Sequence, residues 1–425
     1  MLAGPYSGPA NESQELSNLK YYNVHVKAMR LTVGERSILD GKEGRGRQKA
    51  MEILETLGEI FEADGLIPIR SAQVSGVSYK NLGDAGLEFI AELAQDCKVT
   101  VTTTLNPAGT DLERWKEMGV TEDFFKKQDK VIKAYERLGI IPSCSCTPYY
   151  DANIPKKGEH LAWGESSAVC YVNSIIGART NREGGPSALA AAIVGKTPNY
   201  GLHKDENRRT GLIIEVEAGI KDLAALGYKV GALVGERVPF FRGIDKGIRL
   251  EDLKAMCAAL AASGSVALFH VEGLTPEAGS ALNGPSRSDI ETVPVSKADV
   301  EETAAKLSTT DGKVELVAIG CPHLSPKELK KVASILKDKM PRPEGPTLWV
   351  CTSRASRKAS KEAVKVIERF GPVLCDTCMV VSPIEGLFRS TATNSAKAAH
   401  YLVKDGYGNQ KVRYGTLEEV LALLY

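Results

Sequence analysis

The sequence lacks several features that would assign a protein to a particular compartment or partner. No apolar run approaches the roughly eighteen residues that cross a bilayer, and the first residues have neither the basic stretch nor the apolar core of a secretory signal. Neither sign of charge dominates, because 54 Lys and Arg nearly balance 53 Asp and Glu. We therefore expect a cytoplasmic protein without the global field that would favour nucleic acid or a membrane surface, so any basic site must be local.

The chain also lacks a second Cys-x-x-Cys pair. The pair that is present, Cys375 with Cys378, is half of what a zinc ribbon requires, and it lies far from the N-terminal βαβ unit in which a thioredoxin-like pair occurs. Structural disulfides are not expected among nine cysteines in a reducing compartment. The cysteines are therefore buried apolar side chains or ligands. Four fit the first description, because each lies among apolar neighbours in an expected helix or strand: Cys97, Cys170, Cys257 and Cys351.

Length and apolar content predict a globular protein of several lobes. With 425 residues, of which 43% are hydrophobic, the chain can bury a substantial core, and two or three lobes are expected. Residues 1–28 are rich in Gly, Pro, Ser and Asn, which indicates a loosely attached extension. We place an N-terminal α/β lobe at residues 29–210, a middle α/β lobe at residues 211–312 and a C-terminal βα-repeat lobe at residues 313–425.

The C-terminal lobe has the clearest pattern of secondary structure. The apolar stretches VELVAIG, TLWVC and PVLC are followed by the helix-forming stretches SPKELKKVASIL, SRKASKEAVKVIERFG and TNSAKAAHYLV. Such alternation predicts a parallel sheet covered by helices, and hence an α/β fold. In the middle lobe we expect strands at residues 212–216 and 266–271 and a helix at residues 250–262. No chemical motif stands out there, and the isolated His270 is interpreted as a core or turn residue.

Two loops of the N-terminal lobe have the composition of ligand-binding loops. A β-branched strand at residues 98–104 runs into the loop NPAG and then into a helix expected to begin near Asp111. Ligands of open α/β sheets gather at the carboxyl ends of strands, which is where Asn106 and Pro107 lie. The loop SGVS at residues 75–78 exposes backbone N–H groups suited to an anion, although a plain surface turn explains its composition equally well.

Residues 142–186 contain a dense group of chemically active side chains. Glu165 and Ser166 precede a helix-like run, which places both near a helix N-terminus; a helix-capping pair is the plainer interpretation. Arg179 and Arg182 lie among Gly and Ala residues that let a ligand approach the backbone. Solvated arginines are the plainer interpretation of that pair.

Three cysteines occupy similar places in the expected topology. Cys146, Cys321 and Cys378 each follow a short strand, and Cys321 also precedes a helix. Residues at the carboxyl ends of strands from distant parts of the chain are able to meet at one point, but the sequence alone does not establish that these three do.

Seven motifs resemble, in family order, those of the large subunit of the aconitase X family. They are CTPYY, GEHLAWGESSAV, GARTNREGGPSALAAAI, DENR, GCPHLS, DTCMVV and TNSAKAAHYL. The resemblance implies an aconitase-like α/β fold of several α/β/α lobes with mostly parallel sheets around a central iron–sulfur cluster. It further implies a 4Fe–4S cluster held by Cys146, Cys321 and Cys378, whose three thiolates leave one open iron to act as a Lewis acid toward the substrate hydroxyl.

The resemblance also implies which residues contact the substrate. The catalytic residues would be Glu165, Ser166 and Lys397. The substrate contacts would be Gly76, Val77, Ser78, Asn106, Pro107, Glu165, Ser166 and Lys397. We add Arg179 and Arg182, which with Lys397 are candidate cations for the carboxylate and phosphate ends of a substrate. Which cation faces which end stays open.

The wording of two loops, SGVSYKNLGDAGLEF and TTLNPAG, resembles the archaeal phosphomevalonate dehydratase branch of the family. This implies a hydro-lyase that converts (R)-5-phosphomevalonate to trans-anhydromevalonate 5-phosphate in the mevalonate pathway of isoprenoid biosynthesis. A cis-3-hydroxy-L-proline dehydratase is the alternative, with Glu165 available to the ring amine. A non-catalytic cluster-sensing or RNA-binding protein is a second alternative, which the balanced charge disfavours.

Dehydration of the aconitase type requires a base on the face of the substrate opposite the iron. In the family this base is a serine on a small swivelling domain. No stretch after Tyr401 has the length of such a domain, and residues 1–28 are too few. We therefore expect a heterodimer in which a separate small subunit carries the serine and docks over the cluster.

Overall fold

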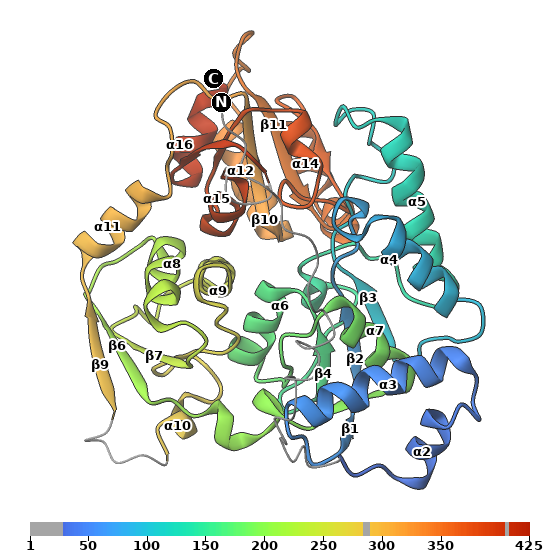
Figure 1. The fold of residues 1–425 in the computed structure, drawn as a ribbon. Helices are drawn as coiled ribbons and strands as arrows, with labels where there is room; N and C mark the ends of the chain where they lie inside the picture. The colour runs from blue at the N-terminus through green and yellow to red at the C-terminus, as the bar shows by residue number, and fades with distance from the viewer. Residues whose placement is uncertain (1–28, 284–289, 404–407) are drawn as a thin grey trace, which may run out of the picture.

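The structure, a computed structural model, describes residues 29–283, 290–403 and 408–425. The expected extension at residues 1–28 lies outside them. Three groups of strands and helices, one from each expected lobe, surround a common centre (Figure 1). The lobe boundaries stay a prediction, although each sheet draws all its strands from one of the three stretches.

The N-terminal lobe contains a three-stranded parallel sheet in the order β3-β2-β4 and a short antiparallel pair, β1 with β5. The strands are β1 (Leu66–Pro68), β2 (Ser71–Val74), β3 (Thr102–Leu105), β4 (Leu161–Trp163) and β5 (Lys196–Pro198). The helices are α2 (Val33–Leu39), α3 (Arg45–Ile60), α4 (Tyr79–Leu93), α5 (Glu122–Arg137), α6 (Ser166–Tyr171) and α7 (Gly185–Val194). The apolar faces of α3, α5 and α7 bury the core of this lobe.

The middle lobe contains a four-stranded parallel sheet in the order β8-β7-β6-β9. Its elements are β6 (Leu212–Val216), α8 (Leu223–Val234), β7 (Pro239–Arg242), α9 (Leu250–Gly264), β8 (His270–Val271), α10 (Ala278–Ala281), β9 (Glu291–Val295) and α11 (Lys297–Lys306). Helices α8 and α9 approach backbone to backbone, because a Cβ atom at Gly264 would lie 2.0 Å from the carbonyl oxygen of Gly231.

The C-terminal lobe contains a five-stranded parallel sheet in the order β12-β11-β10-β13-β14. Its strands are β10 (Leu316–Leu324), β11 (Thr347–Thr352), β12 (Val373–Leu374), β13 (Ser390–Thr393) and β14 (Lys411–Tyr414). Its helices are α12 (Pro326–Leu336), α13 (Arg354–Ala359), α14 (Lys361–Ile367), α15 (Ala396–Leu402) and α16 (Leu417–Leu421). Apart from β1 with β5, every strand pair in the described residues is parallel, which confirms the predicted α/β class.

Helix α9 joins the three lobes. It packs against α8 of its own lobe, α6 of the N-terminal lobe and α15 of the C-terminal lobe (Figure 1). Its residues are mostly small or apolar, and Met256, Cys257 and Leu260 are fully buried, so neighbours are able to pack on several sides. Because α6 begins at Ser166 and α15 carries Lys397, this packing fixes two segments that line the site described below.

Several predicted elements are wrong or too long. The helix expected near Asp111 is a run of turns at residues 112–119. One oxygen of Asp111 accepts from the N–H groups of residues 113 and 114, both at 2.9 Å, while the other accepts from Cys375 N at 2.7 Å. The segment is therefore bound to the C-terminal lobe instead of continuing as a helix. The strand expected at residues 266–271 contains only its last two residues.

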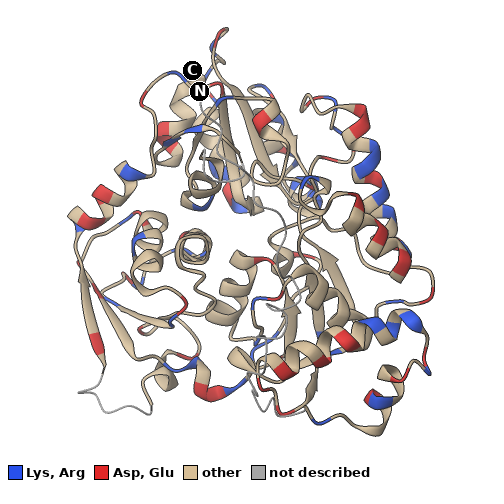
Figure 2. Ribbon diagram, in the orientation of Figure 1, with Lys and Arg blue, Asp and Glu red and all other residues tan. Residues whose placement is uncertain are grey.

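Charged residues of both signs occur in all three lobes. Figure 2 shows lysines and arginines interspersed with aspartates and glutamates on the helices of all three lobes. No helix in the described part of the chain is both long and apolar enough to cross a membrane.

Candidate active site

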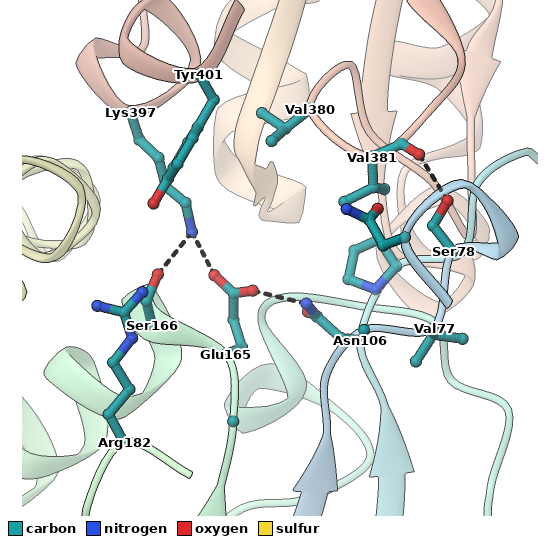
Figure 3. Close-up of a pocket in the computed structure, with 14 residues that line it drawn as sticks. Val77, Ser78, Asn106, Glu165, Ser166, Arg182, Val380, Val381, Lys397 and Tyr401 are labelled. Carbon is teal, nitrogen blue, oxygen red and sulfur yellow. Dashed lines mark hydrogen bonds and ion pairs between the residues drawn. The ribbon is translucent and has the colours of Figure 1, made fainter. Parts of the chain in front are cut away.

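A pocket opens where the N-terminal and C-terminal lobes meet (Figure 3). Its cavity volume is about 230 Å³, which is room for a small molecule. Nine of the ten residues predicted to contact substrate line it: Gly76, Val77, Ser78, Asn106, Pro107, Glu165, Ser166, Arg182 and Lys397. Five lining residues were not predicted from the sequence: Asn81, Gly164, Val380, Val381 and Tyr401. Of these, Tyr401 follows Lys397 by one helical turn, a spacing that places both on one face of α15.

The loop between β2 and α4 leaves backbone N–H groups available at the pocket. Gly76 has a φ of +75°, a left-handed conformation that favours glycine. The N–H groups of Gly76, Val77 and Ser78 donate to no acceptor in the described part of the chain. Two contacts hold the loop: Gln128 of α5 donates to the Val77 carbonyl at 3.0 Å, and the Ser78 hydroxyl donates to the Val381 carbonyl at 2.8 Å. Successive free N–H groups of this kind suit an anion.

Glu165 caps helix α6 and is the acid of a buried ion pair. Its Oε1 accepts from the N–H of Ser167 at 3.3 Å and from the Ser167 hydroxyl at 2.8 Å, which confirms the predicted helix start. Lys397 Nζ donates to the same oxygen, and Asn106 Nδ2 donates to Oε2 at 2.7 Å (Figure 3). Burial opposes ionisation of Glu165, but the charge of Lys397 and these hydrogen bonds outweigh burial and lower the pKa to about 2. Glu165 is therefore ionised, with both oxygens engaged.

Lys397 reaches Glu165 from the opposite lobe. Its Nζ also donates to Ser166 Oγ at 3.1 Å (Figure 3). Burial by itself lowers the pKa of Lys397, but the negative charge of Glu165 and the hydrogen bond to it raise the pKa above the ordinary lysine value. Because Ser166 accepts from Lys397, its own hydroxyl hydrogen stays available, and no acceptor for it occurs among the described residues.

Asn106 has a buried acceptor without a partner. Its N–H donates to the Val74 carbonyl at 2.9 Å, which fixes the end of β3 against β2. Its side-chain Nδ2 is used by Glu165, whereas Oδ1 is buried and has no partner in the described residues. Buried carbonyl groups are rarely unpaired, so this atom is free to accept from a ligand.

The two predicted arginines have different positions. Contrary to the expectation, Arg179 lies outside the pocket: its guanidinium donates to the His203 carbonyl at 3.0 Å and pairs with Asp205. Arg182 lines the pocket, is exposed, and donates to Ser265 Oγ at 3.2 Å. No carboxylate in the described residues lies within ion-pair distance of Arg182. Arg182 therefore has charge available to a ligand, and Arg179 does not.

Cys146, Cys321 and Cys378 converge next to the pocket. The thiol of Cys146 interacts electrostatically with Glu165, Cys378 and Cys321, and Cys378 with Cys321. Burial raises the pKa of all three thiols, that of Cys378 to about 12. All nine cysteines are free. Cys351, which we expected in the core, is buried on β11 and also interacts with these thiols.

The position of Cys321 differs from the expected one. It lies within β10 instead of between a strand and a helix, at a place where the pairing of β10 with β11 is interrupted between Ile319 and Leu324. A Cβ atom at Gly320 would lie 2.1 Å from the carbonyl oxygen of Cys351, so the close approach of the two strands here requires a glycine. The interruption frees the strand from regular pairing around the cysteine.

The thiols of Cys146, Cys321 and Cys378 suit a ligand larger than a single metal ion. No three His, Cys, Asp or Glu side chains in the described residues are arranged around one metal ion. Thiolates that hold a cluster stand farther apart than the ligands of one ion, because the cluster's own atoms lie between them. The hydroxyl of Thr377, which precedes Cys378, is buried without a partner in the described residues. Two buried thiols and one partly buried thiol, from separate segments, therefore fit an iron–sulfur cluster better than a zinc ion.

Comparison with known proteins identifies the family. Sequence profiles of the aconitase X first, second and third domains match residues 28–206, 210–305 and 314–424. The chain belongs to the aconitase X family, as its motifs predicted. It is 45% identical to the protein in the crystal structure of Thermococcus kodakaraensis aconitase X (holo-form), with a TM-score of 0.86 over 93% of this chain and 100% of that one.

Curated relatives carry two kinds of name. The phosphomevalonate dehydratase large subunit of Methanocaldococcus jannaschii is 46% identical over 92% of this chain and 99% of that protein. The protein of the same name from Thermococcus kodakarensis is 47% identical over 92% of this chain and 99% of that protein. The cis-3-hydroxy-L-proline dehydratase of Hypocrea jecorina is 33% identical over 92% of this chain and 67% of that protein.

Proposed function

We propose that this chain is the large subunit of an iron–sulfur hydro-lyase that dehydrates (R)-5-phosphomevalonate to trans-anhydromevalonate 5-phosphate in isoprenoid biosynthesis by the mevalonate pathway. Four relatives named phosphomevalonate dehydratase large subunit are 46% to 48% identical to it, whereas two cis-3-hydroxy-L-proline dehydratases are 33% and 35% identical. The observation that carries the proposal is the pocket, where the ionised Glu165–Lys397 pair and the unpaired Asn106 oxygen lie beside three converging thiols.

The proposed cofactor is a 4Fe–4S cluster held by Cys146, Cys321 and Cys378. Family membership, the holo form of the solved relative and the mutual proximity of the three thiols support it. When bound, a cluster with three protein thiolates supplies one iron as a Lewis acid for the departing hydroxyl.

The acid end of the substrate would be oriented by groups next to these thiols. The ammonium group of Lys397 and the free hydroxyl hydrogen of Ser166 are donors for the substrate carboxylate. The unpaired Oδ1 of Asn106 is an acceptor for the substrate hydroxyl. Holding both groups in place would lower the entropic part of the barrier.

The phosphate would occupy the other part of the pocket. The free N–H groups of Gly76, Val77 and Ser78 are suitable partners for a dianion, and Val77 and Ser78 lie across the pocket from Ser166 and Arg182 (Figure 3). A phosphate is strongly hydrated, so the loop at the exposed Gly76 favours the phosphate, and the buried Lys397 favours the carboxylate.

A base for the carbon-bound proton would come from a second polypeptide. Glu165 has a pKa of about 2 and accepts from Lys397, Asn106 and Ser167, so it is a weak base. No histidine and no other carboxylate line the pocket in the described residues. The relatives are named large subunits, so those proteins have a small subunit. We infer a small subunit here too, whose swivelling domain would place a catalytic serine over the pocket.

The charged groups of the pocket fit the two candidate substrates to different degrees. A hydroxyproline would need a carboxylate for its ring amine, but Glu165 is already paired with Lys397. The lining cation Arg182 has no such partner among the described residues and would be left facing a zwitterion. Phosphomevalonate therefore matches the pocket better.

The test is to combine the chain with its small subunit anaerobically, load iron and sulfide, and incubate with each compound. Mass spectrometry should detect loss of one water from (R)-5-phosphomevalonate and none from cis-3-hydroxy-L-proline. Reaction of cis-3-hydroxy-L-proline without reaction of (R)-5-phosphomevalonate would contradict the proposed substrate. Absence of reaction with either compound by a fully loaded complex would favour the non-catalytic alternative.

A further inference from the structure

One buried histidine contacts the segments of all three proposed cluster ligands. His323 follows Cys321 by two residues and is fully buried. Its ring Nε2 lies 2.9 Å from the carbonyl oxygen of Thr377, the residue before the third ligand. Its ring Nδ1 lies 3.3 Å from Oγ of Ser145, the residue before the first ligand. His323 belongs to the segment of Cys321, so its imidazole links that segment to the segments of Cys146 and Cys378.

The partners of the ring determine its orientation. A carbonyl oxygen can only accept, so Nε2 of His323 donates to Thr377, and in a neutral ring Nδ1 accepts from the Ser145 hydroxyl. Oγ of Ser145 in turn accepts from the N–H of Thr147 at 3.2 Å. The ring N–H at Nε2 thus has an acceptor, and the unprotonated Nδ1 has a donor. A ring flipped by 180° would lose both hydrogen bonds.

The main chain of His323 is engaged as well. Its N–H donates to Sγ of Cys146 at 3.2 Å, and its carbonyl accepts from Nζ of Lys254 at 2.9 Å. Lys254 is a buried residue of α9 and pairs with Glu328, at 2.6 Å, in the capping box that begins α12. All four polar atoms of His323 therefore bind other segments of the chain, including the helix that joins the three lobes.

We propose that His323 is a positioning residue that holds the three cysteine segments at the spacing that the iron–sulfur cluster requires. The inference rests on the cluster of the proposed function. His323 does not line the pocket, so its contribution is to the placement of the thiols and not to contact with substrate. Side chains that orient ligands in this way commonly change metal retention when they are replaced.

The test compares His323 with a second buried histidine. His270, in the middle lobe, is also buried, and its Nε2 lies 2.8 Å from the carbonyl oxygen of Arg208. The full-length chain and its His323→Ala, His323→Gln and His270→Ala variants are loaded anaerobically, and iron release to a chelator is followed by the cluster absorbance. Electron paramagnetic resonance of the loaded chains and the melting temperature of the unloaded chains complete the comparison.

His323→Ala should release iron about 10- to 100-fold faster than the unaltered chain and show a broadened resonance spectrum. His323→Gln should lie between the two, because its amide is able to donate to the Thr377 carbonyl. His270→Ala should lower the melting temperature and release iron at the unaltered rate.

Equal iron release by loaded His323→Ala and loaded unaltered chain would overturn the positioning role while leaving the cluster intact. Failure of the unaltered chain to bind iron and sulfide would refute the proposed function and this inference with it. If His323→Ala does not fold, His323→Gln decides, since it keeps a donor for the Thr377 carbonyl and removes the Nδ1 contact with Ser145. Faster release by that variant supports the role, and an unaltered rate contradicts it.

Discussion

Two buried ionic networks join the lobes, and they differ in how much of their hydrogen-bonding capacity the protein uses. At the joint between the N-terminal and middle lobes, Arg208 is 3% exposed and all of its guanidinium nitrogens have partners. Its acceptors are Asn173, Ala178, Leu202 and Glu277. Between the N-terminal and C-terminal lobes, the Glu165–Lys397 pair lies beside the unpaired oxygen of Asn106 and the free hydroxyl hydrogen of Ser166.

The difference distinguishes a structural joint from a binding site. A buried ion pair has to compensate the loss of hydration, and the joint does so with protein partners alone. The pocket holds its ion pair with protein partners too, but it keeps further donors and acceptors for a ligand. Arg179 and Arg182 are only three residues apart, but they differ in the same way. Arg179 is paired with Asp205, whereas Arg182 has charge available to a ligand.

The largest expected effect comes from Lys397→Met. This change leaves Glu165 charged, buried and without its cation, so we expect the free energy of unfolding to fall by about 3–5 kcal/mol. Because a donor to the substrate is lost as well, kcat/KM should fall about 100- to 1,000-fold. The control is Lys196→Met, since Lys196 pairs with Glu35 at 2.7 Å outside the pocket and should affect stability alone. Unaltered kcat/KM in Lys397→Met would contradict the assignment of the pocket.

Arg208→Met should destabilise the joint without changing the chemistry. The partly buried Glu277 carboxylate and the buried acceptors around Arg208 would lose their hydrogen-bonded cation, and we expect a loss of about 3–5 kcal/mol in denaturant unfolding. The kcat/KM of the protein that remains folded should not change. A large fall in kcat/KM at full folding would show that the joint and the pocket are coupled, and the comparison would fail.

The same joint should make the protein sensitive to acid. His203 is 3% exposed, its Nδ1 lies 3.0 Å from Nδ1 of His160, and its Nε2 is buried without a partner in the described residues. Burial, and then the charges of His160, Arg208 and Arg179, lower the pKa of His203 to about 3 from 6.5.

Between about pH 3 and pH 6.5, His203 therefore binds a proton in the unfolded chain but not in the folded chain. Stability from this group is fully present above about pH 6.5 and should fall by up to about 1.4 kcal/mol for each pH unit below it, down to about pH 3. His203→Gln should flatten the pH dependence of unfolding in this window. An equally steep dependence in the variant would locate the acid sensitivity elsewhere.

The smallest effect is expected from the exposed arginine. Arg182→Gln removes one charge-assisted hydrogen bond that the pocket offers to an anionic substrate, so KM for (R)-5-phosphomevalonate should rise about tenfold. Arg179→Gln is the matched control and should leave KM unaltered, because Arg179 is paired with Asp205. Equal effects of the two changes on KM would remove the distinction between them.

Local signals predicted the parts of the site that depend on local structure. The helix start at Glu165 was predicted because a capping carboxylate and the helix it caps are adjacent in sequence. Asn106 was placed at the end of a strand by the β-branched run before it, and the structure agrees. Family motifs, and not periodicity, pointed to Lys397 as a site residue. Its ion pair with Glu165 was not predicted, since 232 residues separate the two.

Contacts with residues distant in sequence explain the predictions that were wrong. Arg179 was expected at the pocket, but Asp205 and Glu277 hold it elsewhere, and nothing in the sequence around it indicates that pairing. The helix expected near Asp111 did not form, because its carboxylate accepts from Cys375 across the lobe boundary. In both cases the deciding partner is distant in sequence, where single-sequence patterns carry no information.

The most direct test is the iron and sulfide content of the anaerobically purified chain and its single cysteine variants. The unaltered chain should hold roughly four iron and four sulfide atoms. Cluster absorbance should disappear in Cys146→Ser, Cys321→Ser and Cys378→Ser and persist in Cys97→Ser and Cys257→Ser. A cluster that survives Cys146→Ser, or that is lost instead in Cys144→Ser or Cys375→Ser, would contradict the ligand set.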